Sequence, residues 1–113
     1  MDKDTIYSDS NIGKRLSNIH KSEIFKISYN GKQLPMATEI RIGRNPDNNI
    51  VVDDSLASRY HAVIQKIKEE YFLKDLSSSN GTKVNGEVVP SGKYVKLHQS
   101  DTITVGRTDL KVL

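Results

Sequence analysis

Residues 60–76, YHAVIQKIKEEYFLKDL, contain two longer apolar runs and decide between a β fold and a helical one. Tyr60–Ile67 and Tyr71–Leu76 are rich in β-branched and aromatic residues, which favour strands. The alternation of apolar and polar residues is imperfect in the first run, so a helix over residues 60–74 is the competing local interpretation. Turn residues on both sides favour two strands, joined by Lys68-Glu69-Glu70.

Two Asn-Gly pairs indicate hairpins outside this stretch, because Asn-Gly between strands is a strong short hairpin signal. Asn30-Gly31 follows one β-like run, and Asn85-Gly86 interrupts another. The further expected strands are Glu23–Tyr29, Thr38–Gly43, Ile50–Val52, Thr82–Val89 as a small hairpin, Tyr94–Leu97, Thr102–Val105 and Asp109–Leu113. About ten short strands separated by turn residues predict an all-β sandwich or barrel.

The length of 113 residues corresponds to one domain. Residues 1–22, MDKDTIYSDSNIGKRLSNIHKS, lack sustained hydrophobic periodicity and are rich in Ser, Asn, Asp and Lys. Such a composition cannot bury enough apolar surface to order a chain. We therefore expect a flexible N-terminal arm over residues 1–22 and a folded domain over residues 23–113.

Composition excludes several classes of protein. The absence of cysteine excludes disulfides, thiolate metal sites and a cysteine nucleophile. The 17 basic and 14 acidic residues are interspersed, with no basic run, so nucleic acid is not an expected partner. No apolar run approaches the roughly 20 residues that cross a bilayer. There is also no apolar leader segment, so we expect a cytoplasmic protein without a membrane partner.

Catalytic motifs are missing as well. The sequence has no phosphate-binding GxxxxGK[ST], no GxGxxG, no HExxH and no GxSxG. His20, His61 and His98 lie far apart, and no metal-ligand spacing connects them. Ser58 and His61 would point to opposite faces of a strand, which is poor geometry for a nucleophile and its base. We expect a protein that is not an enzyme and binds no cofactor or metal.

Three polar loops contain the candidate binding residues: Gly43-Arg44-Asn45-Pro46, Ser55-Leu56-Ala57-Ser58-Arg59 and Ser77-Ser78-Ser79-Asn80-Gly81-Thr82. If residues 60–67 and 71–76 form a hairpin, the second and third loops lie at the same end. The strand Ile50–Val52 spans only about 10 Å, so the first loop can join them. Guanidinium groups, hydroxyls and backbone N–H groups indicate an anion site. The amide of Asn80 has a donor and an acceptor and can read a peptide backbone.

In this order and spacing, the motifs resemble the forkhead-associated (FHA) domain, a family that reads phosphothreonine peptides. The matching residues are Gly43-Arg44, Asp53, Ser58-Arg59-Tyr60-His61, Asp75, Ser79-Asn80-Gly81-Thr82, Asn85-Gly86 and Asp101-Thr102-Ile103-Thr104-Val105-Gly106. Ser100 departs from the family ending Gly-Asp-x-Ile-x-x-Gly, in which its position is the first Gly. We expect this departure to affect a turn and not the site. The resemblance covers residues 23–113.

The resemblance implies an 11-stranded sandwich of two mainly antiparallel sheets, with peptide binding on the loops at one end. It implies that Arg44, Ser58 and Arg59 hold the phosphate. Ser79 would contact the phosphothreonine or its backbone, and Asn80 would bond the peptide main chain. The structural residues implied are His61, which braces the loop of Ser58, Gly43 and Gly81 for loop geometry, and Asn85-Gly86 for its hairpin. The expected partner is a phosphothreonine protein in a Ser/Thr kinase pathway.

Other functions stay open at this point. The same sandwich could serve as a phospho-independent interaction or dimerisation domain. Alternatively, Thr5 in the arm could be phosphorylated and bound by its own domain at high effective concentration. A small hydrolase has little support, because no nucleophile has an oriented base.

Overall fold

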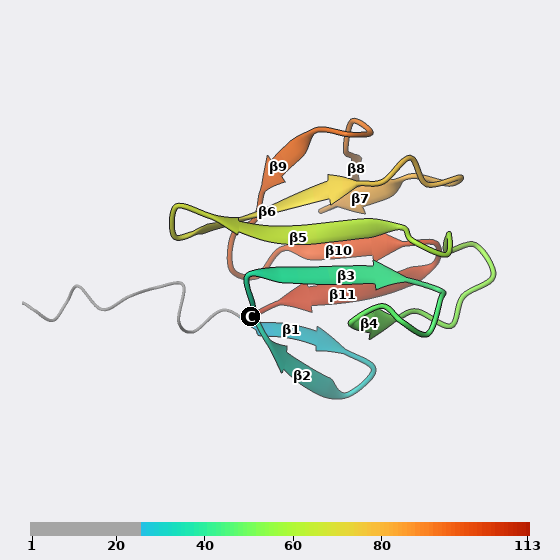
Figure 1. Cartoon of the computed structure of the whole chain (residues 1–113), viewed down its shortest axis with the longest axis horizontal. Helices are drawn as coiled ribbons and strands as arrows, with labels where there is room; N and C mark the ends of the chain where they lie inside the picture. The colour runs from blue at the N-terminus through green and yellow to red at the C-terminus, as the bar shows by residue number, and fades with distance from the viewer. Residues whose placement is uncertain (1–25) are drawn as a thin grey trace, which may run out of the picture.

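A computed structural model describes residues 26–113, and these form eleven strands and no helix (Figure 1). The strands are β1 (Lys26–Tyr29), β2 (Lys32–Pro35), β3 (Glu39–Gly43), β4 (Ile50–Val51), β5 (Ala62–Ile67), β6 (Glu70–Asp75), β7 (Thr82–Val84), β8 (Glu87–Val88), β9 (Tyr94–Lys96), β10 (Thr102–Val105) and β11 (Thr108–Val112). The expected arm over residues 1–22, with Thr5, lies outside the described residues, as does the start of the strand expected from Glu23.

The strands form two sheets packed face to face. One sheet has the order β2-β1-β11-β10-β7-β8, and the other has the order β4-β3-β5-β6-β9. All pairings are antiparallel except β3 with β4, where Ile42 faces Ile50 and Gly43 faces Val51. The predicted sandwich of mainly antiparallel sheets is therefore confirmed.

The stretch that decided the fold forms the hairpin β5–β6, so the helical alternative is wrong. Six consecutive pairs join the strands, from Ala62 with Asp75 to Ile67 with Glu70. The strand starts at Ala62 rather than Tyr60, because His61 still belongs to the preceding loop. The turn is Lys68-Glu69, with φ values of 51° and 69°. Glycine and asparagine usually supply such backbone angles, so the sequence signal for a two-residue turn is absent here.

Both Asn-Gly hairpins are confirmed. Asn30-Gly31 joins β1 to β2, and Asn85-Gly86 joins β7 to β8. The return strand of the first hairpin, Lys32–Pro35, was not among the expected strands. Its sequence KQLP contains one apolar side chain that packs against the core, Leu34, so no alternation reveals it. Lysine and proline suit its position at the edge of the sheet, where they discourage pairing with another chain.

Alternating side chains of the two sheets form one core. The second sheet contributes Ile40, Ile42, Ile64 and Leu73, and the first contributes Ile27, Ile103, Val105, Leu110 and Val112, all essentially inaccessible to solvent. This two-sided burial fixes the register of each strand, since a shift by one residue would turn its apolar side chains to solvent. The core thereby holds the strand ends, and the loops that leave them, in fixed positions.

Ser100 lies in the turn between β9 and β10 with a φ of +77°. Side chains with a Cβ are unfavourable in this region by about 1–2 kcal/mol, whereas glycine adopts it freely at a smaller entropic cost. We expect Ser100→Gly to raise the free energy of unfolding by about 0.5–1 kcal/mol, measured by chemical denaturation. Ser100→Ala keeps the Cβ and should give no gain. Equal stability of the glycine and alanine variants would contradict this explanation.

Candidate functional site

The three polar loops leave their strands at one end of the sandwich (Figure 1). They are residues 44–49 between β3 and β4, residues 52–61 between β4 and β5, and residues 76–81 between β6 and β7. Two backbone bonds tie the first loop to the second: the Arg44 N–H donates to the Ser58 carbonyl over 2.9 Å, and the Asn45 N–H donates to the Arg59 carbonyl over 3.2 Å. The backbone of Arg44 and Asn45 is thus held against the backbone of Ser58 and Arg59.

The third loop joins the second through side chains. The Ser79 N–H donates to Ser58 Oγ over 3.0 Å, and Asn80 Nδ2 donates to the Leu56 carbonyl over 2.9 Å. These bonds connect residues 21 and 24 positions apart in the sequence. The structure therefore brings Arg44, Ser58, Arg59, Ser79 and Asn80 to one place.

His61 is buried beneath this junction. Its Nδ1 accepts a hydrogen bond from the Ser58 N–H over 2.9 Å, and its Nε2 lies 2.9 Å from the Gly81 carbonyl. Because Nδ1 is the acceptor, the ring proton is assigned to Nε2, which donates to Gly81. The imidazole bridges the loop of Ser58 and the loop of Asn80. Its ring does not contact the Ser58 hydroxyl through any hydrogen bond in the described residues, so a Ser–His catalytic pair is not formed there.

Two glycines allow the backbone geometry of the loops. An ideal Cβ on Gly43 would lie 2.2 Å from the Arg59 carbonyl oxygen, so this position cannot hold a side chain without movement of the second loop. Gly81 has a φ of +81°, which favours glycine at the bend that presents its carbonyl to His61.

Arg44 and Arg59 are both exposed, and neither forms an ion pair within residues 26–113. Arg44 uses Nε to bond the Ala57 carbonyl over 3.0 Å, which orients its terminal nitrogens. The two other arginines in the described range have carboxylate partners: Arg41 with Glu39 at 2.8 Å and Arg107 with Asp54 at 3.7 Å. Within the described residues, the guanidinium groups of Arg44 and Arg59 are thus without a carboxylate partner.

The Ser58 hydroxyl adds a donor to these guanidinium groups. Its oxygen accepts from the Ser79 N–H, so its own proton stays available. A tetrahedral oxyanion suits this set, because guanidinium groups bind oxyanions through paired donors and hydroxyls complete the coordination.

Sequence reasoning missed two residues that hold the loops. Asn48 is buried, and its Nδ2 donates both to the Asn45 carbonyl over 2.7 Å and to the Arg59 carbonyl over 2.8 Å. Asp54 accepts bonds from the Leu56 N–H, the Arg107 N–H and the Thr108 hydroxyl over 2.7–2.9 Å. Backbone bonds from Leu56 and Arg107 hold the pKa of Asp54 below its usual value. Nothing in the local sequence distinguishes either residue from a solvated loop side chain.

Asp75, at the end of β6, organises the third loop from a buried position. Its carboxylate accepts bonds from the Ser78 N–H, the Ser78 hydroxyl and the Thr82 hydroxyl. Burial raises the pKa of Asp75, but the hydrogen bonds from Ser78 and Thr82 outweigh burial and bring the pKa below its ordinary value. The ionised carboxylate is therefore part of the folded loop.

This lowered pKa predicts an acid dependence of stability. The ordinary value is 3.8, and the folded value lies below it, so Asp75 stabilises the fold above that pH and its contribution is lost as the pH falls further. At neutral pH we expect Asp75→Asn to reduce the free energy of unfolding by about 1–3 kcal/mol, because an amide nitrogen replaces an acceptor. Denaturation across the acidic range should show the difference between the two proteins shrinking. A difference independent of pH would contradict the assignment.

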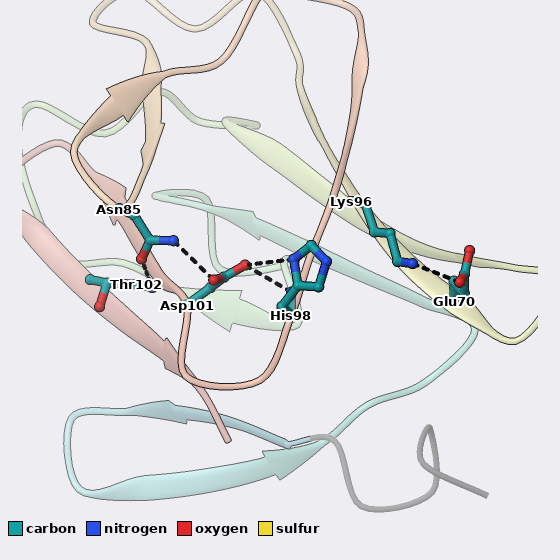
Figure 2. A network of polar contacts seen from close by, with 6 residues as sticks. All are labelled: Glu70, Asn85, Lys96, His98, Asp101 and Thr102. Atoms are coloured by element: carbon teal, nitrogen blue, oxygen red, sulfur yellow. Dashed lines mark hydrogen bonds and ion pairs between the residues drawn. The ribbon is translucent and has the colours of Figure 1, made fainter.

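Asn85 and Gly86 lie outside this junction. Asn85 Nδ2 donates to Asp101 over 2.9 Å, and its Oδ1 accepts from the Thr102 N–H over 2.9 Å (Figure 2). Asp101 also accepts from the His98 N–H. These bonds fasten the β7–β8 hairpin to the turn before β10.

Within residues 26–113, no group of three His, Asp or Glu side chains could hold a metal ion. No helix long and apolar enough to cross a membrane occurs in that range.

The FHA domain family model matches residues 40–106, which is more than half of the chain. The chain therefore belongs to the FHA domain family, as its motifs indicated.

Two curated relatives of the chain are named as regulators. The chain is similar to the transcriptional regulatory protein EmbR of Mycobacterium tuberculosis, with 42% identity over 76 residues that cover 66% of this chain and 19% of EmbR. It is also similar to the glycogen accumulation regulator GarA of the same organism, with 38% identity over 71 residues that cover 63% of this chain and 42% of GarA. The chain spans less than half of the length of these relatives.

Solved structures of other proteins share the fold of this chain. M. tuberculosis EmbR in complex with a low-affinity phosphopeptide gives a TM-score of 0.72 at 35% identity, over 78% of this chain and 24% of that one. A structure described under phosphothreonine-dependent FHA domain interactions gives a TM-score of 0.71 at 27% identity, over 78% of this chain and 93% of that one.

Proposed function

We propose that this FHA domain binds proteins phosphorylated on threonine and acts as an adaptor in Ser/Thr kinase signalling. The observation that carries the proposal is the pair of exposed arginines, Arg44 and Arg59, which the described residues leave without carboxylate partners beside the Ser58 hydroxyl. The phosphopeptide in the related EmbR structure supports the choice of ligand. The domain is proposed as a binding module and not as an enzyme.

In this proposal Arg44, Arg59 and the Ser58 hydroxyl hold the phosphate. Asn80 bonds the peptide main chain. One Nδ2 proton is donated to the Leu56 carbonyl, and Oδ1, which has no partner in the described residues, is the acceptor that we propose for a peptide N–H. Ser79 presents an exposed hydroxyl next to the phosphothreonine, while its N–H is used by Ser58. His61, Asn48 and Asp75 hold the three loops in position through their hydrogen bonds.

The expected affinity follows from these donors. A hydrogen bond to a charged group contributes about 1.5–3 kcal/mol net. Three or four such bonds, reduced by the cost of ordering a flexible peptide, correspond to micromolar binding, with a binding free energy of about −8 kcal/mol. Aspartate in place of phosphothreonine should bind poorly, since it lacks the third oxygen and the second charge.

Titration calorimetry tests the proposal directly. Phosphothreonine, phosphoserine and unphosphorylated pools of otherwise identical degenerate peptides are titrated into the folded protein. Micromolar binding of the phosphothreonine pool, lost on phosphatase treatment, is the expected result. Binding of all three pools alike would favour a phospho-independent interaction domain, and binding of none would overturn the proposal.

A further inference from the structure

Asn80 is followed by Gly81, and this pair has chemistry of its own. In an Asn-Gly pair the glycine N–H meets no Cβ of its own residue, so the backbone nitrogen can approach the asparagine side-chain carbonyl. Residues 26–113 contain three such pairs: Asn30-Gly31, Asn80-Gly81 and Asn85-Gly86. Only Asn80 belongs to the three-loop junction.

The structure restrains the three pairs to different degrees. Asn85 uses both side-chain polar atoms, on Asp101 and on the Thr102 N–H (Figure 2). Asn30 and Asn85 also lie in two-residue hairpin turns, each flanked by paired residues, so rotation of their backbone would pull apart strand pairs. Asn80 lies in an irregular exposed loop with one side-chain bond, from Nδ2 to the Leu56 carbonyl.

Within residues 26–113, the attacking nitrogen of Gly81 has no hydrogen-bond partner, and the Asn80 amide has only one. In the described part of the chain, no hydrogen bond engages the Gly81 N–H. The Asn80 Oδ1 likewise has no partner there, so a single bond holds the amide in its present orientation. Ring closure at this pair therefore requires the loss of one hydrogen bond and no strand pairing.

We propose that Asn80 is a site of spontaneous deamidation that switches the peptide site off, an inference that rests on the proposed function of that site. The deprotonated Gly81 nitrogen attacks Asn80 Cγ, a C–N bond forms, and the Cγ–Nδ2 bond breaks with release of ammonia. Water then opens the resulting succinimide at either carbonyl. The products are aspartate and isoaspartate at position 80, and no oxidant or reductant is involved.

Both products change the site in two ways, and isoaspartate adds a third change. The donor to the Leu56 carbonyl is lost, because a carboxylate only accepts. A negative charge appears beside the loop of Ser58 and Arg59, where it competes with the phosphate. Isoaspartate also lengthens the backbone before Gly81, whose carbonyl contacts His61. We expect phosphopeptide affinity to fall about tenfold or more.

Bound peptide should protect the site from this reaction. When Asn80 Oδ1 accepts a peptide N–H, two hydrogen bonds instead of one hold the side chain away from the Gly81 nitrogen. The switch therefore acts on protein that has no ligand. Deamidation is expected to be slower in the complex, while the rates at Asn30 and Asn85 stay unchanged.

Tryptic mapping during incubation in neutral buffer tests the inference, because trypsin places each pair in its own peptide: residues 27–32, 75–83 and 84–93. The full chain is incubated with and without a saturating phosphothreonine peptide. We expect residues 75–83 to gain the deamidation mass, with isoaspartate, faster than residues 84–93, and this gain to slow in the complex. The Asn30→Gln variant serves as the background for isolating the acidic form by ion exchange and measuring its affinity.

The outcomes separate the two proposals. If fresh protein does not bind the peptide, the proposed function is wrong. The deamidation rates of residues 75–83 and 84–93 then still test whether Asn80 reacts faster than Asn85. Faster reaction at residues 84–93, or an acidic form that binds as tightly as fresh protein, would overturn the inference. Asn80→Asp, prepared directly, should reproduce the weakened binding without incubation.

Discussion

Arg44→Ala is expected to abolish binding of a phosphothreonine peptide and to leave the domain folded. The side chain is exposed, and its one described hydrogen bond, from Nε to the Ala57 carbonyl, contributes about 0.5–1.5 kcal/mol to stability. In the proposed complex the two terminal nitrogens of Arg44 donate to the phosphate, and the loss of two charge-assisted bonds corresponds to a loss of affinity of about 100-fold or more. Calorimetry measures the binding, and denaturation measures the stability.

Arg41→Ala is the matched control, because Arg41 lies on β3, which leads into the loop of Arg44, and is likewise exposed with the same charge. Its guanidinium pairs with Glu39 instead of facing the loop junction, and an exposed pair contributes little. Affinity should therefore change little in that variant. Arg44→Lys should bind more weakly than the native protein, since a point charge replaces a two-pronged donor. Binding that survives in Arg44→Ala would refute the assignment of Arg44 to the phosphate.

Much of the fold could be predicted because its signals are local. The Asn-Gly pairs fix two hairpins, and the alternation over Thr38–Gly43 and Thr102–Val105 fixes the buried face of two strands. Where the sequence carries no local turn signal, the turn could not be predicted. The turn at Lys68-Glu69 has positive φ values without glycine or asparagine, because the paired strands on both sides impose the backbone that local preference opposes.

The candidate binding residues could be predicted from the sequence, but the residues that hold their loops in place could not. The hairpin topology placed Ser58 and Ser79 at one end, and the structure joins them by a hydrogen bond of 3.0 Å. The bond from Arg107 to Asp54 crosses 53 residues, and the two bonds of Asn48 depend on where two carbonyl groups end up after folding. Such contacts arise from tertiary geometry, which no spacing in the sequence encodes.

Gly43→Ala is expected to have the second large effect, on stability and binding together. The added Cβ would lie 2.2 Å from the Arg59 carbonyl oxygen, and that oxygen is fixed by the Asn45 N–H and Asn48 Nδ2. Either β3 or the loop of Arg59 must move. Overpacking of this kind costs about 3 kcal/mol when the neighbour is backbone that cannot rotate away. Movement of Arg59 also separates it from Arg44, so affinity for the phosphopeptide should fall at least about tenfold.

Gly92→Ala distinguishes this clash from the general cost of replacing glycine. Gly92 has a φ of +77°, yet a Cβ there meets nothing within 4 Å. Its replacement should cost only the backbone strain of about 1–2 kcal/mol and leave binding unchanged. At Gly43 the situation is reversed. Its φ lies outside the left-handed region, but an added Cβ would have no space. If Gly43→Ala unfolds at the same denaturant concentration as Gly92→Ala and binds normally, then the close approach of β3 and the Arg59 loop does not position the two arginines.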